Sequence, residues 1–244
     1  MTIALVTGAS RGLGLATVRT LAKNGTCVLL AARDAGRAEE EARSLRSEGL
    51  DVRGIQLDVT SHDSIASAVA TMTAVHGRLD VLVNNAGILP EATDDEAHEF
   101  ANPELFLTTF TTNVFGAVAV TEAFLPLLRR SPMGRIVNVS STMGSLSDQT
   151  DPGSPFYEVV VPAYQASKAA LNSVTIALAK RLAETPIKVT SVCPGFVQTD
   201  LTPANMEQAP LTPAEASLVV AHAATLPDNA ESGTFIDHHG AVAW

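Results

Sequence analysis

Short apolar runs alternate with longer segments of helical periodicity along the chain. The runs have the β-rich composition of buried strands and cover residues 2–7, 26–32, 51–59, 79–86, 134–141, 187–194 and 233–237. Between the first two runs, apolar residues recur at the 3.6-residue spacing of a helix, which Gly25 is predicted to end. Because the runs are uniformly apolar, the pattern predicts strands of a parallel sheet that helices cover on both faces.

The alternation predicts one α/β domain over residues 1–244, a doubly wound sheet with right-handed crossovers. No linker or internal repeat divides the chain. Two segments interrupt the rhythm: residues 144–161 are rich in Gly, Ser, Asp and Pro, and residues 198–214 hold three prolines. We expect an inserted loop near 144–161 and a substrate loop near 198–212, both at strand C-terminal ends, where ligands bind.

Composition favours a packed globular core and argues against two classes of partner. Hydrophobic residues make up 46% of the chain and charged residues 17%. The formal net charge of −10, with both signs interspersed, disfavours a nucleic-acid or anionic-membrane surface. The expected partner is therefore a small molecule.

Other features point to a cytoplasmic protein without a metal site. Cys27 and Cys193 cannot form a disulfide framework and are interpreted as buried, unreactive thiols. No apolar run approaches the roughly 20 residues of a membrane span, and the N-terminus has the pattern of a strand, not a signal peptide. The six histidines show no ligand geometry, so no metal is expected.

A glycine-rich turn, LVTGASRGLGLA, follows the first predicted strand and opens the first predicted helix. Gly8, Gly12 and Gly14 let the backbone approach a bound diphosphate, whose charge a helix N-terminus favours. Their spacing, Gly-x3-Gly-x-Gly, differs from the usual dinucleotide fingerprint. A strand-to-helix turn that needs glycine only for tight packing is the alternative.

Tyr164 and Lys168 are one helical turn apart in the predicted helix that begins near residue 162. A phenol, with a pKa of about 10, holds its proton until an alkoxide forms on a reduced carbonyl. A nearby ammonium lowers that pKa and eases the transfer. Tyr157, the other tyrosine, has Val160 and Val161 at the corresponding positions, so we interpret it as a pocket wall or loop packing.

Five motifs, in their order and rough spacing, resemble the short-chain dehydrogenase/reductase family. They are TGASRGLG at 7–14, NNAG at 84–87, SS at 140–141, YQASK at 164–168 and PG at 194–195. The resemblance runs from about residue 2 to 200. It implies a Rossmann-type fold with about seven parallel strands, helices on both faces, and a nicotinamide cofactor used for hydride transfer.

The resemblance implies a catalytic set of Asn113, Ser141, Tyr164 and Lys168. Ser141 would hydrogen-bond the substrate carbonyl oxygen, while Ser140 should point to the opposite face of its strand. Asn113 would help hold a water that relays protons to the lysine. A structural hydrogen bond explains this mid-helix asparagine about as well.

The resemblance also implies a cofactor site. Asp58 would accept a hydrogen bond from the adenine, beside the Val59 backbone, although an N-cap role remains open and Ser61 is also placed for it. One side chain of the Asn84–Asn85 pair would brace the central sheet. The predicted cofactor-binding residues are Gly8, Ser10, Arg11, Gly12, Leu13, Gly14, Arg33, Asp58, Val59, Asn85, Ala86, Gly87, Tyr164, Lys168, Pro194, Gly195, Val197 and Thr199.

Within this set, Val197 would meet the nicotinamide carboxamide, and Thr199 would bond the carboxamide or the diphosphate. The alternative for Pro194 and Gly195 is a simple proline-glycine turn.

The second strand ends in VLLAARDAGR, which bears on the choice between NAD and NADP. Ala32 occupies the position where NAD-using relatives carry an aspartate, and Arg33 follows it. Arg33 and Arg11 suit the 2′-phosphate of NADP, because a guanidinium binds phosphate bidentately. Both could instead be solvated surface charges, and Asp34 keeps NAD open if the register shifts by two. We predict NADP(H).

Ser141 and Tyr164 are 23 positions apart, farther than in many family members, which indicates an insertion within residues 144–161. Monomeric carbonyl reductases of the family also carry an insertion before the tyrosine. An insert there could obstruct the helix face that forms dimers in relatives, so a monomer is favoured, with a homodimer as the alternative.

These observations predict an NADPH-dependent reductase of a ketone or aldehyde, or a dehydrogenase of the matching secondary alcohol that runs the reaction in reverse. The alternatives are an NAD-dependent alcohol dehydrogenase and a non-catalytic NADP(H)-sensing protein. We expect residues 89–95, 142–162 and 198–212 to build the substrate pocket. Their apolar content suggests a moderately hydrophobic carbonyl compound.

Overall fold

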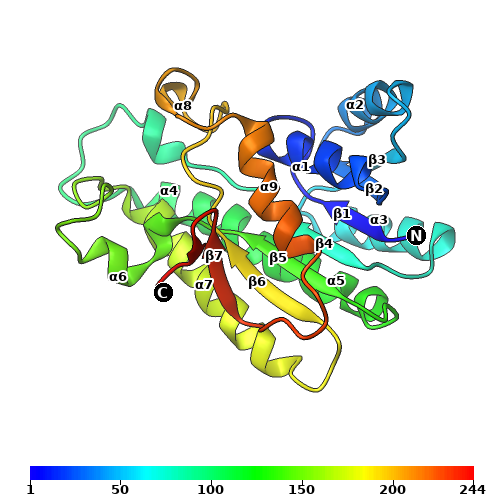
Figure 1. Cartoon of the computed structure of the whole chain (residues 1–244). Helices are drawn as coiled ribbons and strands as arrows, with labels where there is room; N and C mark the ends of the chain where they lie inside the picture. The colour runs from blue at the N-terminus through cyan, green and yellow to red at the C-terminus, as the bar shows by residue number, and fades with distance from the viewer.

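A single sheet of eight strands runs through the protein (Figure 1), whose computed structural model describes residues 1–244. The strand order is β3-β2-β1-β4-β5-β6-β7-β8, and only the β7–β8 pair is antiparallel. The order reverses beside β1, which confirms the predicted doubly wound topology. The strands are β1 Ile3–Val6, β2 Cys27–Ala32, β3 Val52–Gln56, β4 Val81–Asn84, β5 Arg135–Val139, β6 Lys188–Val192, β7 Thr234–Asp237 and β8 Gly240–Ala241.

Helices cover both faces of the sheet, as predicted (Figure 1). Helices α1, α2 and α9 contribute to the core on one face, and α3, α5 and α7 to the core on the other. The longer helices are α1 Gly12–Lys23, α2 Ala35–Ser47, α3 His62–Val75, α4 Pro103–Phe110, α5 Ala117–Leu128, α7 Pro162–Arg181 and α9 Pro213–Ala224, with a π-helical turn η2 at Thr111–Gly116. The short ones are η1 Pro90–Thr93, η3 Thr142–Gly144, α6 Leu146–Gln149 and α8 Pro203–Gln208.

Strand β1 shows why a central run is apolar at every position, whereas the edge strand β3 has both buried and exposed positions, with Arg53 and Gln56 exposed. Ala4 and Val6 pack into the core beneath α1, whereas Ile3 and Leu5 pack into the core beneath α3 and α5. Successive side chains of a strand point to opposite faces, so a strand covered on both sides needs apolar residues at every position. Each fully buried leucine of this kind stabilises the fold by roughly 1.5–3 kcal/mol.

Local signals set most helix ends. Asp34 accepts a hydrogen bond from Arg37 N and caps α2, and Ser61 accepts from Ser64 N and caps α3. Thr212 and Glu215 form a reciprocal capping box at α9. Helix α1 ends at Lys23, and the predicted stop Gly25 has a φ of +82°, a left-handed conformation that favours glycine.

The two segments predicted as loops contain short helices. Helix α6 lies inside the inserted segment and is capped by Ser145, and α8 lies inside the 198–212 segment and is capped by Thr202. Strand β8 was not predicted either. Elements of two to six residues are too short to show a hydrophobic period, so the sequence pattern could not separate them from loops.

Although no uninterrupted apolar run reaches the length of a membrane span, one helical stretch has the length and the mean hydropathy of such a span. It is the continuous helical stretch Pro103–Leu128. Half of its most apolar window is buried inside the fold, with Val120 and Phe124 in the core beneath the sheet. It is a core helix.

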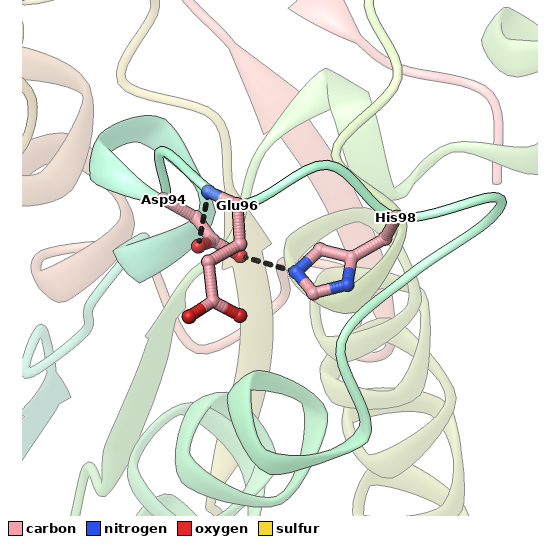
Figure 2. Close-up of side chains that lie close together, drawn as sticks. All are labelled: Asp94, Glu96 and His98. Atoms are coloured by element: carbon pink, nitrogen blue, oxygen red, sulfur yellow. Dashed lines mark hydrogen bonds and ion pairs between the residues drawn. The ribbon is translucent and has the colours of Figure 1, made fainter.

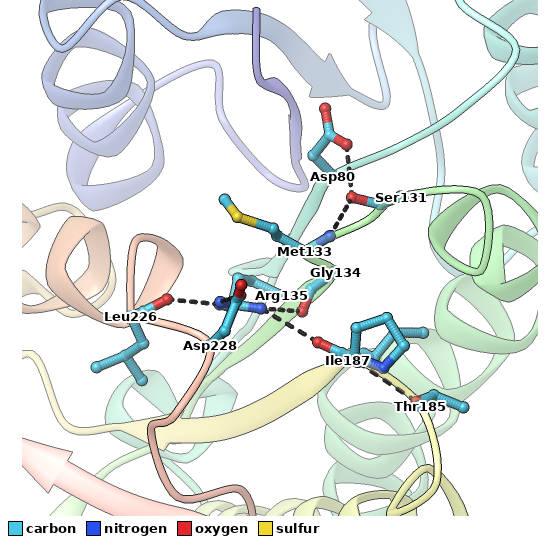
Figure 3. Close-up of polar contacts among 10 residues, drawn as sticks. Asp80, Ser131, Met133, Gly134, Arg135, Thr185, Ile187, Leu226 and Asp228 are labelled. Carbon is cyan, nitrogen blue, oxygen red and sulfur yellow. Dashed lines mark hydrogen bonds and ion pairs between the residues drawn. The ribbon is translucent and has the colours of Figure 1, made fainter.

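The amino-terminal edge of the sheet is held by a buried arginine (Figure 3). Arg135, only 2% exposed, donates to the carbonyl oxygens of Gly134, Pro186 and Leu226 and pairs with Asp228 at 2.8 Å. These bonds tie three loops together below β5. The opposite, carboxyl-terminal edge is left open for ligands.

Candidate active site

A cleft of about 670 Å³ opens at the carboxyl ends of the strands beside the switch point. All eighteen predicted cofactor residues line it, together with Ser141, and Asn113 alone of the predicted site residues does not. The further lining residues are Ala32, Leu57, Thr60, Ile88, Leu107, Thr108, Thr111, Thr112, Val139, Ser140, Asp200, Leu201 and Asn205.

The glycine-rich turn forms one wall of this cleft. Gly8 and Gly12 have φ values of +61° and +53°, which other residues rarely adopt. A Cβ on Gly14 would lie 2.6 Å from both Asn85 Nδ2 and Gly8 O, so the turn needs glycine there for close packing as well. The N-cap Arg11 gives α1 no side-chain cap, so the first N–H groups of the helix remain available to an anion.

The loop after β4 is locked to the glycine-rich turn. Thr7 Oγ1 accepts hydrogen bonds from the backbone N–H groups of Asn85 and Ala86, and Asn85 Nδ2 donates to Thr7 O and Gly8 O. Asn84 instead turns into the sheet, where its Nδ2 donates to Asn138 Oδ1 at 2.8 Å. Asn84 is therefore the predicted asparagine that braces the sheet.

The end of β2 carries the residues that bear on the cofactor's ribose. Ala32 and Arg33 line the cleft, whereas the carboxylate of Asp34 is engaged at the N-terminus of α2. Arg11 forms an exposed ion pair with Asp200 across the cleft mouth.

Asp58 accepts hydrogen bonds from the backbone and hydroxyl of Thr60. Because Ser61 caps α3, the alternative in which Asp58 serves as that N-cap is wrong.

Tyr164 and Lys168 lie together on α7, 8% and 4% exposed, with Lys168 Nζ 5.4 Å from the tyrosine ring centroid. Lys168 Nζ donates to Val139 O at 2.7 Å. Helix α7 packs closely on η3: a Cβ on Gly144 would lie 2.6 Å from the backbone carbon of Lys168. The pair is therefore fixed between β5 and the turn that follows it.

Burial controls the pKa of both groups. Loss of water raises the pKa of Tyr164; the Cys193 thiol adds to this, and a hydrogen-bonding interaction with Ser141 opposes it. Burial likewise lowers the pKa of Lys168 to about 8. The expected lowering of the tyrosine pKa is not seen in this structure: desolvation of the phenolate raises that pKa, and the lysine is not among the groups that shift it.

Ser141 and Ser140 differ in surroundings, as strand alternation predicts. Ser141 is partly exposed in the cleft, and its Oγ accepts from Met143 N at 3.1 Å. Ser140 is 2% exposed, and its hydroxyl donates to Lys168 O at 3.4 Å. Apart from its interaction with Tyr164, the hydroxyl proton of Ser141 has no protein partner and is available to a ligand.

Asn113 is buried in η2, and protein groups bond both of its amide protons and its Oδ1. Its Oδ1 accepts from Ile88 N, and its Nδ2 donates to Ile88 O and to Ser167 Oγ, at 2.9–3.0 Å. These contacts correspond to the structural hydrogen-bonding role that was the alternative interpretation of Asn113. Its part in a water relay stays a prediction.

The predicted substrate segments differ in outcome. None of residues 89–95 or 142–162 lines the cleft, whereas Thr199, Asp200, Leu201 and Asn205 of the third segment do. Tyr157 does not line the cleft, so it is not a wall of it, and at 42% exposure its side chain is partly covered within its loop. Leu107 and Thr108 of α4 and Thr111 and Thr112 of η2 line the cleft instead, and none of these four residues was predicted from the sequence.

Sequence reasoning also missed Glu91. Its carboxylate oxygens accept hydrogen bonds from Ala163 N at 2.9 Å and Tyr164 N at 2.8 Å. The signal that could have suggested such a partner is that Val161, before Pro162, offers no capping side chain.

Figure 2 shows Asp94, Glu96 and His98 turned toward one another in the loop after η1. Their potential ligand atoms lie within 4.8 Å of one another, so the expectation that no histidine has ligand geometry was wrong for His98. Asp94 bonds His98 Nε2 at 3.1 Å and Glu96 N at 3.2 Å, which closes the loop on itself. Exposed acidic groups of this kind are common without an ion, and we assign the cluster no metal role.

Both cysteines are free and buried, as predicted. Burial raises the pKa of Cys27 to about 11 and also raises that of Cys193, so both thiols stay protonated at neutral pH.

Proteins of known sequence or structure match this chain over most of its length. A putative ketoacyl reductase of the granaticin polyketide synthase from Streptomyces violaceoruber is 38% identical over 203 residues, which are 82% of this chain and 69% of that protein. The structure of NADPH-bound carbonyl reductase from chicken fatty liver matches with a TM-score of 0.85 at 28% identity and covers 100% of both chains. Salutaridine reductase from Papaver somniferum matches with a TM-score of 0.82 at 27% identity, over 96% of this chain and 99% of that one.

A doubly wound sheet with a glycine-rich turn and a buried tyrosine–lysine pair in one cleft defines a nucleotide-dependent oxidoreductase. The sequence model of the family described as short chain dehydrogenase matches residues 2–210, and the chain belongs to the short-chain dehydrogenase/reductase family. It is an oxidoreductase of carbonyl or alcohol compounds, with the nicotinamide cofactor typical of that family.

Proposed function

We propose that this protein is a carbonyl reductase-type enzyme that uses NADPH to reduce a ketone or aldehyde, or NADP⁺ to oxidise the matching secondary alcohol. One observation carries the proposal: Ser141, Tyr164 and Lys168 line the same cleft as the glycine-rich turn. A nucleotide held at that turn would extend toward the only buried phenol of the chain.

The residues of the cleft fit NADP(H). The uncapped N-terminus of α1 suits the diphosphate. At the ribose end, Ala32 offers no carboxylate, Asp34 is engaged as an N-cap, and Arg33 supplies a cation for the 2′-phosphate. NADPH, when bound, would supply the hydride. The carbonyl reductase from chicken fatty liver was solved with NADPH, which supports the same choice here.

The chain's own residues would handle the proton. Because burial raises its pKa, Tyr164 is fully protonated at neutral pH and can donate to the alkoxide that forms on the substrate. Ser141 Oγ already accepts from Met143 N, so its O–H is left to donate to the same oxygen. The Lys168 ammonium stabilises the phenolate that remains, with two N–H groups beyond the one given to Val139.

The cleft mouth supports a moderately hydrophobic substrate. Leu107 on α4 and Leu201 before α8 line it and are partly or largely exposed, which suits an apolar carbonyl compound.

The oligomeric state and the cytoplasmic location stay predictions. Hydrogen bonds of the inserted segment run to η3 and to the carbonyl of Trp244. Sedimentation equilibrium of the purified protein distinguishes the favoured monomer from the homodimer.

A panel of ketones and aldehydes, assayed with NADPH and NADH in parallel, tests the proposal. We expect turnover with NADPH to exceed turnover with NADH. Arg33→Ala should raise the KM for NADPH roughly 10- to 100-fold, because a charge-assisted contact to phosphate is lost, and leave that for NADH nearly unchanged.

A clear preference for NADH in the wild-type protein would instead establish the NAD-dependent alternative. Tight NADPH binding without turnover on any compound would establish a sensing protein.

A further inference from the structure

We propose that Glu91 is a positioning residue for Tyr164, whose carboxylate fixes the first turn of α7 at the cleft. The inference rests on the proposed function, because it concerns the same proton transfer. Glu91 touches neither the cleft nor the reacting atoms, and it acts through the tyrosine.

Helix α7 has no N-cap side chain for its first N–H groups. Val161 at the N-cap position has no side-chain acceptor, and Pro162 occupies the first helical position. The first hydrogen bond within the helix runs from Gln165 N to Val161 O. The N–H groups of Ala163 and Tyr164 therefore depend on a partner from elsewhere in the chain.

Glu91 is that partner, from 72 positions earlier in the sequence. Each of its two oxygens accepts one bond, at 2.9 Å from Ala163 N and 2.8 Å from Tyr164 N. A carboxylate at a helix N-terminus has the favourable sign for the helix dipole and makes the stronger, charge-assisted kind of hydrogen bond. The backbone of the proposed proton donor is thereby held directly.

The segment that carries Glu91 is itself held by hydrogen bonds. Glu91 lies in η1, three positions after Ile88, which lines the cleft and whose N–H and C=O are both bonded by Asn113. The residues just before α7 are bonded to the Gln165 side chain, which accepts from Val161 N and donates to Val159 O at 3.1 Å each, but neither bond reaches the N–H groups of Ala163 and Tyr164. Glu91 thus sets the position of Tyr164 relative to the cofactor-side loop.

Glu91→Ala is the variant that tests this role, with Glu96→Ala as the matched control because the Glu96 carboxylate in the same loop has no bonded partner. We expect Glu91→Ala to lower kcat roughly 10- to 100-fold, because a small misplacement of a catalytic group is that costly. The KM for NADPH should change less than about threefold, since the glycine-rich turn is untouched. Glu96→Ala should match the wild-type protein.

Two further variants separate positioning from general destabilisation. In a Tyr164→Phe background, Glu91→Ala should lower the rate by less than about twofold, because its effect passes through the phenol. Adding Val161→Asp to Glu91→Ala places an acceptor at the ordinary N-cap position and should restore at least about half of the lost kcat. An undiminished kcat in Glu91→Ala, or an equal loss in the Tyr164→Phe background, would overturn the proposal.

Amide hydrogen exchange tests the bonds from Ala163 N and Tyr164 N to Glu91 independently of activity. In Glu91→Ala, exchange at the amides of Ala163 and Tyr164 should rise at least about 10-fold, while the capped start of α9 is unchanged. Unchanged exchange at these amides refutes the role of Glu91. A wild-type protein that reduces no carbonyl compound refutes the proposed function instead, so the two failures are distinguishable.

Discussion

Tyr164 and Tyr157 show what a single side chain's surroundings add to its chemistry. Tyr164 is 8% exposed beside a lysine, whereas Tyr157 is 42% exposed and outside the cleft. The spacing to Lys168 favoured Tyr164, and the structure places this tyrosine beside the lysine in the cleft. The spacing could not give the direction of the tyrosine's pKa shift, which depends on burial, nor Glu91, which is distant in sequence and carries no local motif.

Lys168 is predicted to reduce the stability of the fold at neutral pH. Its pKa is lowered to about 8, so below pH 8 it is charged in both states and the burial cost is fully present. Between pH 8 and its unfolded pKa of about 10.4, the folded state releases the proton first, so the cost fades as pH rises. Lys168→Met should therefore raise the free energy of unfolding by roughly 1–3 kcal/mol at pH 7, after allowing for the lost bond to Val139 O.

Urea unfolding at pH 7 and at pH 10 measures this effect. The gain should be present at the lower pH and nearly absent at the higher one, while activity is lost at both. A Lys168→Met protein that is less stable than the wild type at pH 7 would contradict the prediction.

At the scale of elements, the sequence pattern located the seven parallel strands because each is an apolar run between turn residues. It missed β8, α6 and α8, which are two to six residues long. It also missed the part of α4 and η2 in the cleft wall, because contact across the cleft depends on how the helices pack. The predicted cofactor residues lie together because strand ends and their following turns are brought to one edge by the topology.

Arg135, at the start of β5, is predicted to stabilise the fold without contributing to catalysis. Arg135→Met would leave the carbonyl oxygens of Gly134, Pro186 and Leu226 without their donor, which costs roughly 2–4 kcal/mol. Activity per folded molecule should stay within about twofold of the wild type, because this edge is opposite the cleft. Thermal unfolding measures the predicted loss of stability, and active-site titration with kinetics measures the activity per folded molecule. A large loss of kcat in the folded variant would refute the prediction that Arg135 serves stability and not catalysis.

In the whole molecule, the stabilising contacts of Arg135 and the candidate active site lie at opposite edges of one sheet. The amino-terminal edge is closed by the buried Arg135 contacts, and the carboxyl-terminal edge holds the cleft with its glycine-rich turn and its buried tyrosine–lysine pair. A doubly wound sheet favours this division, because its parallel strands all end at the same edge. The family membership, the fold and the cleft therefore lead to the same class of reaction.

The most direct measurement is the rate of NADPH oxidation by Tyr164→Phe with a carbonyl substrate that the wild-type protein reduces. Tyr157→Phe is the matched control, since it removes the same hydroxyl from the only other tyrosine. We predict that kcat falls roughly 100- to 10,000-fold in Tyr164→Phe, the usual range for a lost general acid, and stays within about twofold in Tyr157→Phe. Undiminished turnover by Tyr164→Phe would contradict the assignment of Tyr164 as the proton donor.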